Sequence, residues 1–103
     1  MSKMPKLRKT DRRFALYQHG FECYVEFPGD AWKDYNRYVR YCRDRVGPEF
    51  WAFSSRVFEN GDWKGVAHYQ GTAEGSKRVY LKNPAIHTML LLVINDDINT
   101  VYL

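Results

Sequence analysis

The sequence is poor in the residues and patterns that build disulfides, membrane spans and export signals. It has two cysteines in 103 residues and no run of about 18 apolar residues that could cross a membrane. The first residues lack the apolar core of a secretory signal, so we expect a cytoplasmic protein with reduced thiols. Cys23 and Cys42 fall on the apolar faces of their predicted elements and are expected to be free, buried thiols.

Motifs for metal, phosphate and nucleophilic chemistry are missing as well. The cysteines and histidines form no C-x-x-C or H-x-x-x-H pair of the kind that zinc sites use. Neither G-x-x-x-x-G-K-[ST] nor G-x-G-x-x-G occurs, and no nucleophile elbow surrounds Ser54 or Ser55. We therefore expect no cofactor, no metal and no catalytic activity.

Positive charge is concentrated at the N-terminus. Residues 1–13 contain six basic residues and one acidic residue, whereas the remainder has ten basic and eleven acidic residues. We predict that residues 1–12 are a flexible basic arm and that residues 13–103 form a single α+β domain. Such an arm suits phosphate groups or an acidic protein surface, or it serves solubility alone. Its basic residues are Lys3, Lys6, Arg8, Lys9, Arg12 and Arg13.

The strongest local signal is a hairpin within residues 50–70. Asn60-Gly61 favours a type I′ turn, because both residues tolerate positive φ. Pairing outward from this turn places Phe58 opposite Trp63 and Phe53 opposite His68. One face of the hairpin would then show Trp51, Phe53, Val57 and Val66. The other face would show Phe50, Arg56, Phe58, Trp63 and Tyr69.

A helix is predicted before this hairpin, capped by Asp30 and stopped by Gly47-Pro48. Its apolar residues recur every three or four positions and form one stripe. These residues are Trp32, Tyr35, Val39, Cys42 and Val46. A second stripe carries the cations Lys33, Arg37 and Arg40.

Alternation of apolar and polar residues predicts the other strands. They cover Arg13–Gln18, Phe21–Phe27, Lys77–Lys82 and Thr100–Leu103. The segment Ala85–Asn95 is apolar nearly all round, which leaves a helix and a central strand as alternatives. Asn83-Pro84 favours the helix, because Asn suits an N-cap and Pro suits the first helical position.

With that helix, the element order predicts a ferredoxin-like β-α-β-β-α-β fold. Its antiparallel sheet would carry both helices on one face, with an additional N-terminal strand and a possible split in the third strand. The alternative is a single helix packed on a five- to six-stranded antiparallel sheet. In the ferredoxin-like fold the second sheet face stays open.

The residues from Phe21 to Leu92 resemble many short proteins encoded by bacteriophages. The shared features are a strand, a helix rich in Tyr and Trp, an aromatic hairpin, and a late strand RVYLKN that leads into an apolar helix. This chain departs from the pattern in its final segment, NDDINTVYL. The resemblance implies a small accessory protein that acts by binding in the host cytoplasm. It would inhibit or modulate a host complex, or be a minor component of the virion.

The predicted binding surface combines aromatic and basic side chains. Aromatic rings beside arginine favour single-stranded nucleic acid by stacking, and the same residues are typical of protein–protein hot spots. We therefore expect a non-catalytic binding protein whose partner is a host protein or nucleoprotein complex. Direct binding of single-stranded nucleic acid is the alternative. The residues expected to bind are Arg56, Phe58, Trp63, Tyr69, Lys33, Arg37 and Arg40.

Overall fold

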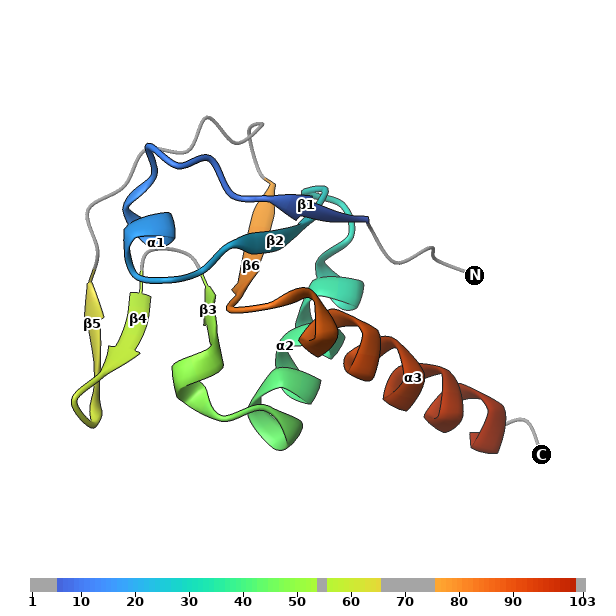
Figure 1. Cartoon of the computed structure of the whole chain (residues 1–103). Helices are drawn as coiled ribbons and strands as arrows, with labels where there is room; N and C mark the ends of the chain where they lie inside the picture. Colours follow the sequence, from blue (N-terminus) through green and yellow to red (C-terminus); the bar gives the residue numbers. More distant parts are fainter. Residues whose placement is uncertain (1–5, 54–55, 66–75, 102–103) are drawn as a thin grey trace.

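The computed structural model of the chain describes residues 6–53, 56–65 and 76–101, and shows an α+β fold (Figure 1). Its strands are β1 (Leu7–Lys9), β2 (Cys23–Phe27), β3 (Trp51–Phe53), β4 (Arg56–Glu59), β5 (Asp62–Gly65) and β6 (Lys77–Leu81). Its helices are α1 (Ala15–Gln18), α2 (Trp32–Arg45) and α3 (Pro84–Val101), with a short 3₁₀ turn η1 at Pro48–Phe50. None of the helices, within the described residues, has the length and apolar character needed to span a membrane.

The six strands form one antiparallel sheet in the order β1-β2-β6-β3-β4-β5. The ferredoxin-like order was wrong at both ends of the chain. Arg13–Gln18, predicted as a strand, contains helix α1, and the predicted strand at Thr100–Leu103 overlaps the end of α3. The architecture is compatible with the alternative of a helical layer on an antiparallel sheet, although three helices are present instead of one.

The N-terminal segment belongs to the sheet rather than to a flexible arm. Strand β1 pairs with β2, with Leu7 opposite Val25 and Lys9 opposite Cys23. The backbone N–H of Thr10 donates to the carbonyl of Glu22 at 2.9 Å and extends this pairing. The prediction of a flexible arm through residue 12 was therefore wrong for Leu7–Lys9.

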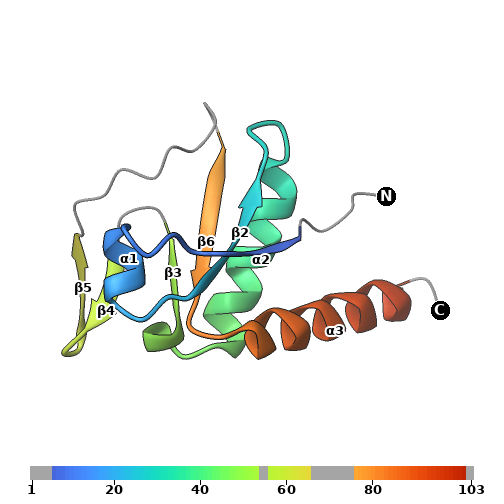
Figure 2. The ribbon, with the colours of Figure 1, turned by 45° about the horizontal axis from the view of Figure 1, so that its top comes forward.

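Each face of the sheet carries its own apolar cluster, and the two clusters have different helices (Figure 2). We call the face covered by α2 and α3 the helix face; its sheet residues are Cys23, Val25, Phe27, Trp51, Val79 and Leu81. The opposite face packs against α1 through Leu16. Its other buried members are Phe21, Ala52, Val57 and Tyr80. The face predicted to stay open is therefore covered in part by the N-terminal segment.

The predicted hairpin is correct near its turn and wrong beyond it. Asn60 and Gly61 both have positive φ, 52° and 83°, and Phe58 pairs with Trp63 as predicted. Phe53, however, pairs with Arg56 on one side and Val79 on the other, so its predicted pairing with His68 was wrong. The chain reverses between Phe53 and Arg56 and splits the predicted long strand into β3 and β4.

This reversal changes which side chains share a face. Directly paired residues point to the same side of a sheet. Arg56 and Phe58 therefore lie on the same face as Phe53 and Trp51. Val57 lies on the opposite face with Leu16, contrary to the prediction. Trp63 lies on the helix face, where its ring is 5.7 Å from that of Trp51. Val66, His68 and Tyr69 lie outside the described residues.

Helix α2 matches its predicted stripe over most of its length. Val39 and Cys42 are buried against the helix face, and the helix ends at Arg45, just before Gly47-Pro48. Two predictions were wrong. The N-cap residue is Ala31 rather than Asp30, and Trp32 is 54% exposed because it lies at the border of the buried stripe in the first turn.

Helix α3 confirms the helical alternative for Ala85–Asn95. It begins at Pro84, and Leu90 and Ile94 are buried against α2 and the sheet, with Ile86 and Met89 partly buried beside them. Truncating Leu90 to alanine would leave a cavity, at a cost of about 2–5 kcal/mol.

A buried hydrogen bond joins α2 and α3. Tyr38 is inaccessible to solvent, and its hydroxyl oxygen lies 2.7 Å from Nδ1 of His87, which is itself buried. Burial lowers the pKa of His87 from its ordinary value of 6.5 and raises the pKa of Tyr38, so both groups are neutral near pH 7. The hydrogen bond therefore joins two neutral groups, and the tautomer of His87 sets which of them donates.

The buried histidine predicts a loss of stability in acid. The unfolded chain binds more protons than the folded one from about pH 6.5 down to the lower pKa of folded His87, so stability falls as pH falls through this window. We expect the melting temperature to decrease between about pH 7.5 and about pH 5, and His87→Gln to reduce that decrease. A pH profile unchanged by His87→Gln would contradict this role.

The two thiols are predicted to be inert in the native protein. Both are free and buried, and burial raises the pKa of Cys23 to about 11 and of Cys42 to about 12. Because the thiolate is the reactive form, a thiol reagent at neutral pH should label both residues slowly until denaturant is added. Fast labelling of the folded protein would show that these positions open to solvent.

Candidate functional site

Three of the predicted binding residues meet at one end of the sheet. We call Arg56, Phe58 and Trp63 the hairpin surface. The Phe58 and Trp63 rings are 5.5 Å apart and half-buried, and the Arg56 side chain is exposed. The β4–β5 hairpin lies at the end of the sheet opposite α3 (Figures 1 and 2). Helices α2 and α3 therefore leave this end of the helix face accessible.

The hairpin surface is an extension of the core. Trp63 packs edge-on against Phe53 at 5.5 Å and against Trp51 at 5.7 Å, and Trp51 is 2% exposed. Trp63 is partly accessible, as predicted, but it also covers the core cluster. Replacing Trp63 would therefore disturb both a surface and the packing beneath it, whereas Arg56 and Phe58 lie farther from the core.

The remaining predicted cations lie on other parts of the molecule. Lys33, Arg37 and Arg40 are exposed on α2, and the Lys33 ammonium lies 5.6 Å from the exposed Trp32 ring. At the N-terminus, Lys6, Arg8, Lys9, Arg12 and Arg13 are exposed, while Lys3 lies outside the described residues. These two groups lie on helix α2 and on the N-terminal segment, separate from the β4–β5 hairpin.

The opposite face of the sheet holds a cluster that the sequence did not predict. We call Tyr24, Glu26, Arg78 and Tyr80 the arginine–tyrosine cluster. In the β2–β6 register Tyr24 is opposite Tyr80, and Glu26 is opposite Arg78. The guanidinium of Arg78 lies over the Tyr24 ring, 4.1 Å from its centroid, and Nη1 donates to the Tyr80 hydroxyl at 3.1 Å.

Arg78 is a buried cation that is not fully satisfied. Its side chain is 9% exposed, and Nε faces the Glu26 carboxylate at 3.5 Å. Among the described residues, Nε of Arg78 has no hydrogen-bond partner. Burial alone would lower the pKa of Arg78, but the hydrogen bond to Tyr80 and the charge of Glu26 outweigh it and raise the pKa. The guanidinium therefore stays charged beneath the surface.

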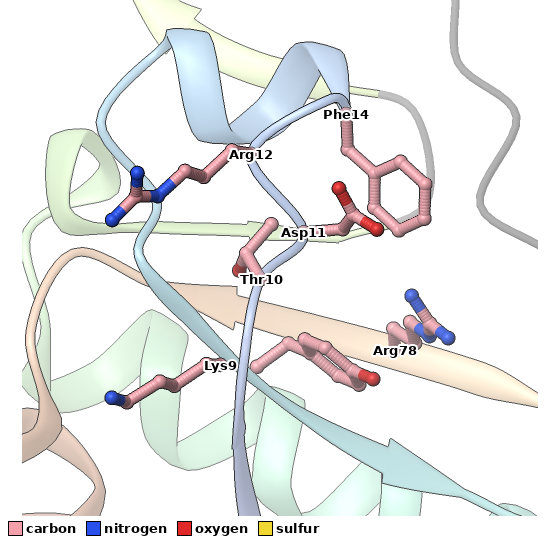
Figure 3. Close-up of a pocket in the computed structure, with 7 residues that line it drawn as sticks. Lys9, Thr10, Asp11, Arg12, Phe14 and Arg78 are labelled. Carbon is pink, nitrogen blue, oxygen red and sulfur yellow. The ribbon is translucent and has the colours of Figure 1, made fainter.

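A cavity of about 570 Å³ opens between this cluster and the segment joining β1 to α1. In Figure 3, Arg78, Phe14 and Asp11 lie on one side of that segment, whereas Lys9 and Arg12 extend toward the other. The cavity is lined by Lys9, Thr10, Asp11, Arg12, Phe14, Tyr24 and Arg78. It thus combines cations and aromatic rings with one carboxylate.

Two details define the polar lining of the cavity. Asp11 accepts hydrogen bonds from the backbone and guanidinium of Arg13 at 2.8–3.1 Å, which lower the pKa of Asp11 to about 2. Its charge is therefore matched by a neighbouring cation. The Thr10 hydroxyl, in contrast, is buried and has no hydrogen-bond partner among the described residues.

The described residues contain no group of three His, Cys, Asp or Glu side chains that could hold a metal ion. His19 and Glu59 form a pair at 3.1 Å, which ties α1 to β4 across the opposite face.

Comparisons with protein-family models, with curated proteins and with solved structures found no match for this chain.

Proposed function

We propose that this chain is a non-catalytic binding protein of the phage accessory type, which docks a protein of a host complex on the hairpin surface and so inhibits or modulates that complex. The observation that supports docking is the continuity of the aromatic ladder. It runs from buried Trp51 through Phe53 and Trp63 to half-buried Phe58, with exposed Arg56 beside it. The accessory role rests on the resemblance to short bacteriophage proteins.

The composition of the hairpin surface favours a protein partner. Tryptophan and arginine are enriched at hot spots, because they bury large areas and add directional hydrogen bonds. Here the core holds the Trp63 ring in place, so little side-chain freedom remains to be lost on binding. Phe50, in the adjoining η1 turn, is 47% exposed and adds apolar area nearby. The positive charge of Arg56 suits an acidic patch on the partner.

The hairpin surface can be tested with a charge reversal and a matched control. Arg56→Glu should weaken capture of a protein partner from a bacterial lysate by about 1–3 kcal/mol, and Phe58→Ala should act in the same direction. Lys64→Glu is the control, because Lys64 is an exposed residue of the neighbouring strand on the opposite face. Equal capture by Arg56→Glu, Lys64→Glu and the unaltered chain, all with the same melting temperature, would contradict the proposal.

A second candidate function is direct binding of single-stranded nucleic acid by the exposed cations of the N-terminal segment. It is supported by five cations, at positions 6, 8, 9, 12 and 13, which are exposed close together along the chain. Nuclease treatment and salt separate the two candidates. Phosphate contacts weaken steeply as salt increases, whereas a hot-spot interface with a protein weakens little.

A further inference from the structure

The cavity under the β1–α1 segment has the components of a ligand site that is independent of the hairpin surface. Arg78 is a cation whose side chain is more than nine-tenths buried, and charged side chains are seldom buried so deeply unless they are paired. Glu26 balances its charge at 3.5 Å but is too distant to satisfy its Nε hydrogen. The Thr10 hydroxyl at the same cavity also lacks a partner among the described residues. Both of these atoms lie beneath the surface, so a ligand in the cavity would meet the remaining N–H groups of the Arg78 guanidinium.

The charge of the lining indicates an anion. Three cations line the cavity, against the single carboxylate of Asp11: Arg78 on the same side of the segment as Asp11, and Lys9 and Arg12 on the other side (Figure 3). Asp11 is itself paired with Arg13, and Arg78 with Glu26. Including Arg13 and Glu26 adds one charge of each sign, so the surplus stays at two positive charges. A phosphate monoester carries a charge of about −1.5 to −2 at neutral pH, which matches this surplus.

The aromatic lining indicates that the anion carries a flat ring. The Tyr24 ring packs against the Arg78 guanidinium and lies 5.3 Å from the Tyr80 ring, and these two contacts restrict its rotation. Phe14 belongs to neither apolar cluster and lies on the same side of the segment as Arg78 (Figure 3). Its ring is therefore available to stack on a base, and base–aromatic stacking contributes about 1–3 kcal/mol. A cavity of about 570 Å³ has the size of a small-molecule site.

We propose that this cavity binds a nucleotide, with its phosphate held by the Arg78 guanidinium and its base stacked on Phe14. Arginine suits this role because its planar guanidinium can hold two phosphate oxygens while its face rests on Tyr24. Free mononucleotides and the nucleotides of a single strand share this chemistry. The site does not depend on the function proposed for the hairpin surface, which lies on the other face of the sheet.

The test is calorimetric titration of the full chain with each of the four ribonucleoside 5′-monophosphates. The corresponding nucleosides, inorganic phosphate and a single-stranded hexanucleotide are titrated as separate arms. We expect at least one nucleotide to bind, and to bind about tenfold or more tightly than its nucleoside or than phosphate, because phosphate and base both contribute. Binding of the hexanucleotide with no measurable binding of monophosphates would assign the site to nucleotides within a strand.

Two variants locate the binding in the cavity. Arg78→Lys keeps a positive charge beside Glu26, so that the Glu26 carboxylate is not left buried and unpaired. The exchange removes only the planar guanidinium. Phe14→Ala removes the stacking ring without touching that ion pair. Each should weaken nucleotide binding about tenfold. Arg45→Lys, the same exchange at an exposed position on α2, should leave nucleotide binding unchanged.

The proposal is overturned if neither the monophosphates nor the hexanucleotide bind below about 1 mM. It is equally overturned if Phe14→Ala and a folded Arg78→Lys bind like the unaltered chain. If Arg78→Lys fails to fold, Phe14→Ala decides the outcome by itself. The capture experiment with Arg56→Glu tests only the hairpin surface, and the nucleotide titration tests only the cavity. Either proposal can therefore be contradicted without affecting the other.

Discussion

The pairing of β6 with β2 on one side and with β3 on the other is the contact on which the rest of the structure depends. Three consecutive residues of β6, Val79, Tyr80 and Leu81, are completely buried. A strand covered on both faces needs a layer on each side of the sheet. Helices α2 and α3 supply one layer, and the short N-terminal segment with α1 supplies the other.

The uneven thickness of these two layers accounts for both candidate sites. On the helix face, α2 and α3 cover the strands around β2 and β6 but do not cover the β4–β5 end. The aromatic side chains of Phe58 and Trp63 are therefore partly accessible to solvent there. On the opposite face, one short helix and a connecting segment cannot fill the space above β2 and β6. A cavity remains there, and the polar residues Arg78 and Glu26 occupy the sheet beneath it.

Much of the local structure could be predicted because it depends on neighbouring residues. Asn60-Gly61 specifies its own turn and the first pairs beside it, whatever the rest of the chain does. The period of α2 and the stop at Gly47-Pro48 are likewise local, as is the start of α3 at Pro84. Helix α1 was missed because Phe14 to Gln18 is short and rich in apolar and aromatic residues that also suit a strand, while the packing of Leu16 in the cluster on the opposite face favours the helix.

The sites depended on contacts that no local pattern encodes. The reversal between Phe53 and Arg56 pairs these two residues directly, and paired residues share a face. Trp63, paired with Phe58, therefore lies on the same face as Phe53 instead of the opposite one. Arg78 and Glu26 were visible only as polar residues on alternating strands, and their burial follows from a register between segments some fifty residues apart. The sequence by itself determined the Asn60-Gly61 turn, helix α2 and the distribution of charge. Only the tertiary structure decided which side chains share a face and which cation is buried, because both follow from the pairing of distant strands.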